Sequence, residues 1–117
     1  MVAFEIWING AKFLTAGVAS DLGMLTTILS WTKRDTSRLP AEVRADVTGE
    51  ELKLAVNGQN NLGDNQFENL QWKGADLKPG DEIRVVIVDA DHVDKPETVR
   101  KISPQYVRPK RSDIILH

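Results

Sequence analysis

The stretch from Ser20 to Asp35, with the sequence SDLGMLTTILSWTKRD, constrains the fold more than any other part of the chain. At helical spacing its largest apolar side chains fall on about half of the circumference, which is the pattern of an amphipathic helix. These side chains are Leu22, Met24, Leu25, Ile28, Leu29 and Trp31. Ser20 is a suitable N-cap, and Lys33 with Arg34 places positive charge at the negative end of the helix dipole. We therefore expect one amphipathic helix over about residues 20–35.

Alternating apolar residues predict a β-hairpin before this helix. Val2–Ile8 carries apolar side chains at every second position, which is typical of a half-buried strand. Asn9 and Gly10 follow, and both residue types accept the positive φ angles that a type I′ turn requires. Ala11–Ala16 then returns as the second strand.

Several short strands are expected after the helix. Leu52–Val56 alternates between apolar and other residues, and the Asn57-Gly58 pair after it is a typical turn signal. Residues 59–66, QNNLGDNQ, are polar and predict a mobile loop, with a further strand over Phe67–Trp72. Residues 42–48 fit either a strand or a short helix, and we favour extended structure.

A turn and a long strand are expected near the end of the domain. Pro79-Gly80 predicts a type II turn, because proline fixes φ at the second position and glycine accepts positive φ at the third. Glu82–Ala90, EIRVVIVDA, is rich in β-branched residues and is apolar on both faces from Val85 onward. That pattern favours a central strand covered on at least one side.

Together these elements predict an α+β fold: a mixed sheet of four to six strands with the helix of residues 20–35 packed on one face. We expect a single α+β domain over residues 1–90 and a C-terminal arm over residues 91–117.

The element order resembles the β-grasp, or ubiquitin-like, fold. The resemblance rests on the Asn9-Gly10 hairpin, the helix after it, the Leu52–Val56 strand and the last strand after Pro79-Gly80. Conjugating members of that family end in Gly-Gly, whereas this sequence ends in Ile-Ile-Leu-His, so the resemblance does not imply conjugation or sulfur transfer. The chain also resembles uncharacterised small bacterial protein families, which imply no function.

Composition excludes several classes of protein. The sequence has no cysteine, which excludes disulfides, thiolate nucleophiles and zinc–cysteine sites. No apolar run approaches the roughly 20 residues that span a bilayer, and the N-terminus lacks a secretory pattern. We therefore expect a cytoplasmic protein. The net charge of −2 gives no general attraction to nucleic acid.

No pattern of catalytic or metal-binding residues is recognisable. The densest acidic cluster surrounds His92, but Pro96 and the missing glycine interrupt the spacing of a calcium loop. The cluster consists of Asp89, Asp91, Asp94 and Glu97. There is no nucleophile motif and no glycine-rich phosphate loop. We expect no enzymatic activity, no cofactor and no metal.

Abundant tryptophan favours a binding function. Trp7 lies on the face of the first strand opposite Phe4 and Ile6, where it either forms an interface or packs under the C-terminal arm. Met24 and Trp31 lie at one margin of the expected helix, and are either core residues or an exposed apolar edge. With Trp72 these are the partner-binding candidates, since tryptophan is enriched at interfaces. We expect a non-catalytic protein-binding module, of accessory, adaptor or immunity type, whose partner is another protein or a second copy of itself.

The basic C-terminal arm supports an alternative. From residue 98 to 117 the sequence has five basic residues and one acidic residue, whereas residues 42–97 carry 13 acidic and six basic residues. Nucleic acid could bind the arm through its cations with an aromatic ring to stack on the bases. These residues are Arg100, Lys101, Tyr106, Arg108, Lys110 and Arg111. The arm could equally dock on an acidic surface, and a small-molecule pocket between sheet and arm also stays open.

Overall fold

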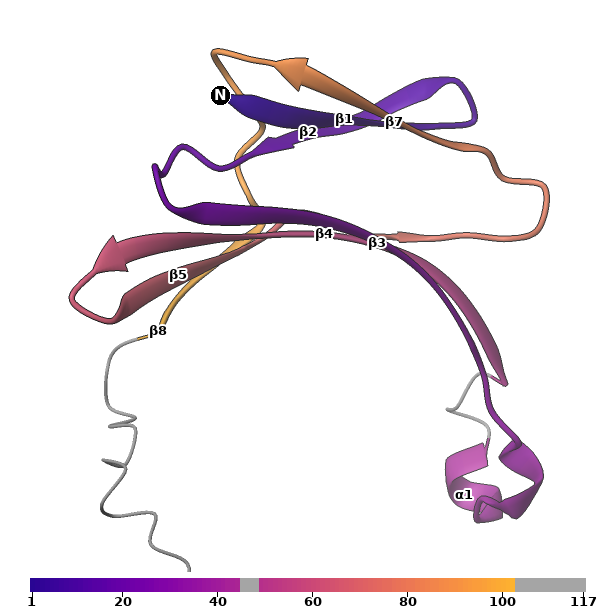
Figure 1. The fold of residues 1–117 in the computed structure, drawn as a ribbon. Helices are drawn as coiled ribbons and strands as arrows, with labels where there is room; N and C mark the ends of the chain where they lie inside the picture. The colour runs from indigo at the N-terminus through magenta and orange to yellow at the C-terminus, as the bar shows by residue number, and fades with distance from the viewer. Residues whose placement is uncertain (45–48, 103–117) are drawn as a thin grey trace, which may run out of the picture.

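The fold is a sandwich of two antiparallel β-sheets. The computed structural model describes residues 1–44 and 49–102, of which 61% lie in strands and 6% in helices. Figure 1 shows one sheet above the other, with a long ribbon of β3 and β4 curving away from the sandwich. The strands are β1 (Val2–Ile8), β2 (Ala11–Gly17), β3 (Gly23–Lys33), β4 (Glu50–Gly63), β5 (Gln66–Gln71), β6 (Ala75–Asp76), β7 (Ile83–Asp89) and β8 (Thr98–Ile102).

The first sheet has the strand order β2-β1-β7. Its β1–β2 hairpin turns at Asn9 and Gly10, whose φ angles of 51° and 79° are those of a type I′ turn. The predicted hairpin is therefore confirmed. β7 pairs with β1 along its whole length, from Val2 opposite Asp89 to Ile8 opposite Ile83. β7 was expected to be a central strand, but in the described part of the chain it forms the edge of this sheet.

The second sheet has the strand order β3-β4-β5-β8, and the short β6 pairs with β4. β3 and β4 are paired over eleven consecutive positions, from Gly23 opposite Asn60 to Lys33 opposite Glu50. Beyond this ribbon lie a 3₁₀ turn (Thr36–Arg38) and a four-residue helix α1 (Ala41–Arg44). Extended structure was favoured over 42–48 but is wrong for residues 42–44, and residues 45–48 lie outside the described ranges.

The predicted amphipathic helix is absent, because residues 23–33 form strand β3. Ser20 does accept a hydrogen bond from the Leu22 N–H, at 3.1 Å, but it does so in a turn before the strand and not as a helix cap. β3 is rich in β-branched threonine and isoleucine, and pairing with β4 supplies hydrogen bonds that local helical preference cannot match. No described helix reaches seven residues, so the expected α+β class with a helix packed on the sheet is wrong.

The second predicted turn is also wrong, because Asn57 and Gly58 lie inside β4. A Cβ at Gly58 would stand 2.8 Å from Val18 Cγ2 and 3.2 Å from Trp72 Cζ3, so close packing, and not a turn, requires glycine there. The residues expected to form a polar loop largely continue β4. The chain reverses instead at Asp64 and Asn65, whose φ angles are 52° and 60°.

The core lies between the two sheets. Its buried members from the first sheet are Ile6, Leu14 and Ala16, and those from the second sheet and its flank are Leu54, Val56, Leu70 and Trp72. Trp72 is only 2% exposed, and its Nε1 donates a hydrogen bond of 2.8 Å to the carbonyl oxygen of Asp94. Residues 91–94 are thereby joined to the sandwich, and β8 pairs with β5 from Gln71 opposite Thr98 to Phe67 opposite Ile102.

The turn at Lys78–Asp81 forms as predicted. The Asp81 N–H donates to the Lys78 carbonyl at 3.1 Å, and Gly80 has a φ of 97°. The Asp81 carboxylate also accepts from the Asn9 side-chain amide at 3.0 Å, which ties this turn to the tip of the first hairpin. Within residues 1–44 and 49–102 no helix has the length and apolar content needed to cross a bilayer.

Candidate functional site

β3 presents a long strand edge that no other described strand covers. Among the described residues its only strand partner is β4, so the backbone groups on its other side are unpaired. The register with β4 is continuous over eleven residues, and no charged side chain or proline occurs from Gly23 to Thr32. Folded proteins usually protect such edges with charges, prolines or bulges, because an exposed edge is a template for another strand.

Large apolar side chains line this edge on both faces. Met24 and Ile28 point to the outer face of the second sheet. Leu29 and Trp31 point to the core-facing side, because they lie opposite Leu54 and Leu52 of β4. All four β3 side chains are between 50% and 62% exposed. Leu29 and Trp31 thus occupy core-facing positions that nothing in the described structure covers.

The edge of the first sheet is apolar on the same side of the sandwich. Val85 and Ile87 of β7 pair with Ile6 and Phe4 and so face inward, yet Ile87 is 72% exposed. β1 shares a hollow with the start of β3, while β2 is joined through Asp94 to Trp72 at the end of β5. Because β7 flanks β1 on the side away from β2, it lies toward β3. We call the surface formed by Leu29, Trp31, Val85 and Ile87 the open side.

The opposite side of the sandwich is protected. The backbone N–H of Thr15 in β2 donates to the Asp94 carboxylate at 2.8 Å, and the Thr15 carbonyl accepts from the Asp94 N–H at 2.9 Å. β2 also has a bulge near Phe13, where its register with β1 shifts. β8, the other edge of the second sheet, is only five residues long and carries Arg100 and Lys101. Within the described residues, the uncharged β3 edge and the exposed apolar side chains of β7 therefore occur together on the open side.

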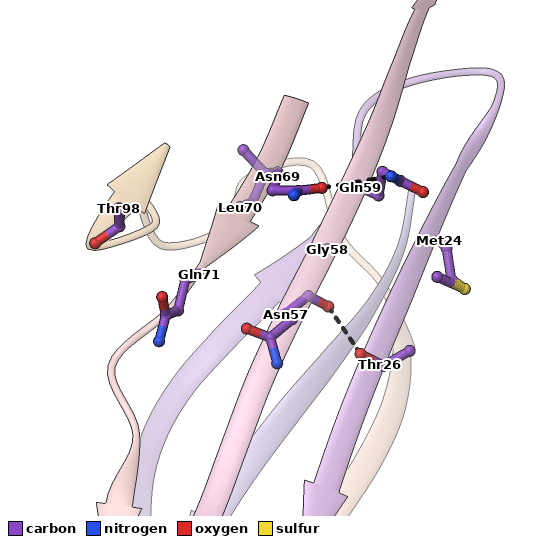
Figure 2. Close-up of a pocket in the computed structure, with 9 residues that line it drawn as sticks. All are labelled: Met24, Thr26, Asn57, Gly58, Gln59, Asn69, Leu70, Gln71 and Thr98. Carbon is purple, nitrogen blue, oxygen red and sulfur yellow. Dashed lines mark hydrogen bonds between the residues drawn. The ribbon is translucent and has the colours of Figure 1, made fainter. Parts of the chain in front are cut away.

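The outer face of the second sheet contains a shallow hollow of about 360 Å³ (Figure 2). It is lined by uncharged side chains, mainly amides and hydroxyls: Met24, Thr26, Asn57, Gly58, Gln59, Asn69, Leu70, Gln71 and Thr98. The Gln59 amide donates to Asn69 Oδ1 at 3.4 Å, and the Thr26 hydroxyl donates to the Asn57 carbonyl at 3.4 Å. This surface can donate and accept hydrogen bonds, and none of its lining residues carries a charge.

The structure does not bring the four predicted binding residues together. Met24 and Trp31 are both exposed, but they lie on opposite faces of β3. Trp7 is half-buried on the outer face of the first sheet, where its Nε1 is enclosed and has no hydrogen-bond partner among the described residues. Trp72 belongs to the core and does not reach the surface.

The basic arm is described only in part. Arg100 pairs with Asn69 and Lys101 with Glu68 in the β5–β8 ladder, and both side chains are exposed. The other residues of the predicted nucleic-acid surface, Tyr106, Arg108, Lys110 and Arg111, lie outside the described residues.

The acidic residues with altered pKa values have structural roles. The pKa of Asp81 is lowered, first by the hydrogen bond from the Asn9 side chain and then by the Lys78 backbone N–H. Hydrogen bonds from the Ser37 side chain and backbone lower the pKa of Asp35 at the tip of the ribbon. Among the described residues, no three histidine, aspartate or glutamate side chains are grouped so that they could hold a metal ion.

Comparison with known proteins identifies no relative. No protein-family model matches the chain, and neither the curated proteins nor the solved structures include a match. The comparisons therefore do not bear on the β-grasp resemblance.

The open side is the feature that sequence reasoning missed. One signal was present: Leu25, Thr27, Leu29 and Trp31 alternate at strand spacing within the segment assigned to a helix. At that spacing the segment predicts a strand without charges. The pairing with β4 then shows that its other edge has no strand partner among the described residues.

Proposed function

We propose that this chain is a non-catalytic protein-binding module that binds through the free edge of β3. The observation that carries the proposal is the uncharged edge from Gly23 to Thr32, flanked by exposed Leu29 and Trp31. A partner strand added there gains main-chain hydrogen bonds from the edge and apolar contacts from alternate side chains.

The composition of the edge supports a protein partner over other ligands. An edge without charge offers no ionic attraction for phosphate groups, whereas its unpaired N–H and C=O groups match those of a second polypeptide strand. Tryptophan is enriched among interface residues that dominate binding energy, and Trp31 lies at this edge.

Site-specific photocrosslinking tests the proposal. A photoreactive amino acid replaces Leu29 in the full chain, which is expressed in cells of the native source. The matched control replaces Leu62, another exposed leucine, near the β4–β5 turn. We expect polypeptide crosslinks from position 29 and not from position 62, and we expect Trp31→Lys to abolish them. Equal crosslinking at both positions, or none at position 29, contradicts the proposal.

A further inference from the structure

We propose that the partner of the β3 edge is a second copy of this chain, paired antiparallel about a two-fold axis at Ile28. The inference rests on the proposed function and adds the identity and geometry of the partner. It would join the two second sheets into one continuous sheet of eight main strands.

The symmetry follows from the strand itself. When a strand pairs antiparallel with its own copy and both copies keep the same face inward, the axis must pass through one residue. Ile28 is the midpoint of β3, so an axis there uses all eleven residues of the strand. Leu25 then lies beside the partner's Trp31, Thr27 lies beside the partner's Leu29, and Ile28 meets its own copy on the outer face.

Charge favours this antiparallel arrangement. The strand is uncharged until Lys33 at its C-terminal end, and Asp21 lies just before its N-terminal end. Neither residue takes part in an ion pair within residues 1–44 and 49–102. In this register Lys33 of each copy lies opposite the partner's Gly23, two residues from the partner's Asp21, whereas parallel pairing in register would place the two lysines together.

The exposed apolar side chains of β7 distinguish a second copy from an isolated peptide strand. Because the axis is perpendicular to the sheet, both first sheets lie on the same side of the joined sheet, and their β7 edges face each other. Val85 and Ile87 of both copies then converge above Leu29 and Trp31. A single added peptide strand would cover β3 but leave β7 exposed, so a second copy accounts for both edges of the open side.

Cysteine crosslinking of the full chain tests this geometry, because the sequence contains no cysteine of its own. Directly opposed residues of antiparallel strands lie about 4.5–5.5 Å apart between Cα atoms, within the range of a disulfide. Ile28→Cys is therefore expected to form a disulfide-linked dimer under mild oxidation. Met24→Cys is the matched control, since it lies on the same face and is similarly exposed. Its two copies would be about 26 Å apart.

Sedimentation of the wild-type chain over a wide concentration range provides the second measurement. We expect a dimer that Leu29→Lys converts to monomer and that Leu62→Lys leaves intact. A chain that stays monomeric, or a dimer in which Met24→Cys crosslinks as readily as Ile28→Cys, overturns the inference. If the chain is monomeric while position 29 still captures a different protein in cells, only this inference fails. If position 29 captures neither a different protein nor a second copy, the proposed function fails too.

Discussion

Replacement of Gly58 by alanine tests the packing of the sandwich most directly. Gly58 lies inside β4, paired with Leu25 on one side and Leu70 on the other. Its φ angle is not positive, so an alanine is not opposed by backbone conformation. The added Cβ would instead stand 2.8 Å from Val18 and 3.2 Å from the Trp72 ring, both closer than ordinary contact.

Two opposing effects set the size of the change. Overfilling a packed core typically costs about 1–3 kcal/mol. Replacing glycine by alanine also restricts the unfolded chain, which stabilises the fold by about 0.4–1 kcal/mol. We therefore expect Gly58→Ala to lower the free energy of unfolding by roughly 1–2 kcal/mol.

Urea unfolding followed by tryptophan fluorescence measures this change. Gly49→Ala is the control, because the atoms nearest to its added Cβ are 3.7 and 3.9 Å away and its φ angle is not positive. It should leave the stability unchanged or raise it slightly. Val18→Ala should partly rescue Gly58→Ala, so that the double variant loses less stability than the sum of the single changes. A Gly58→Ala protein as stable as Gly49→Ala, or strict additivity with Val18→Ala, would refute this account of the packing.

Three further outcomes are expected from local contacts. Trp72→Phe removes the hydrogen bond to the Asp94 carbonyl and should lower the free energy of unfolding in urea by about 1–3 kcal/mol. It should also make proteolytic cleavage after residue 90 faster. An unchanged cleavage rate would mean that this bond does not hold residues 91–94 to the sandwich. Thr27→Val replaces an enclosed hydroxyl that has no hydrogen-bond partner among the described residues. The free energy of unfolding should therefore stay the same or rise by about 1 kcal/mol. A clear loss of stability would show that the hydroxyl does make a hydrogen bond. Because hydrogen bonds lower the pKa of Asp81 in the folded chain, its stabilising effect is present above the ordinary value of 3.8 and is lost as pH falls through the folded pKa. Asp81→Asn should therefore be less stable than the wild type at pH 7 and lose less stability on acidification, and parallel pH curves for the two proteins would contradict this.

Turns were predictable because they depend on a few neighbouring residues. Asn9-Gly10 and Pro79-Gly80 specify backbone angles that few other residue types accept, and the structure has turns at both places. Asn57-Gly58 has the same local signal. Its glycine is required for a different reason, because Val18 and Trp72, far away in the sequence, leave no room for a Cβ at Gly58. A dipeptide cannot distinguish these two uses of glycine.

The strand β3 was mistaken for a helix because its apolar residues satisfy both periodicities. Leu25, Leu29 and Ile28 fit one side of a helix, while Leu25, Leu29 and Trp31 also alternate as in a strand. Ser20 adds to the ambiguity, since its bond to the Leu22 N–H is the same local interaction that an N-cap makes. Pairing with β4 decides between the two, and that pairing is not encoded within the segment.

The candidate site was less predictable than the fold for a related reason. Exposed Met24 and Trp31 were chosen as candidates from their residue types, but their neighbours on the surface depend on which strand lies at an edge. In the described part of the chain β3 and β7 are both edges on the same side, and this arrangement depends on contacts between residues far apart in the sequence.

The pairing of β1 with β7 also determines when the molecule can fold during its synthesis. Ile6 pairs with Val85, so the first sheet cannot be completed until residue 85 has been synthesised. The two residues are far apart in the sequence, which gives this pairing a high contact order. Ribosomes extend a chain by roughly 5–20 residues per second, so β3 emerges several seconds before β7 has been made. In that interval the core-facing side chains of the second sheet lack the first sheet that packs on them in the finished sandwich, so they are accessible to neighbouring nascent chains. We therefore expect the yield of folded protein to depend on translation speed between residues 34 and 89.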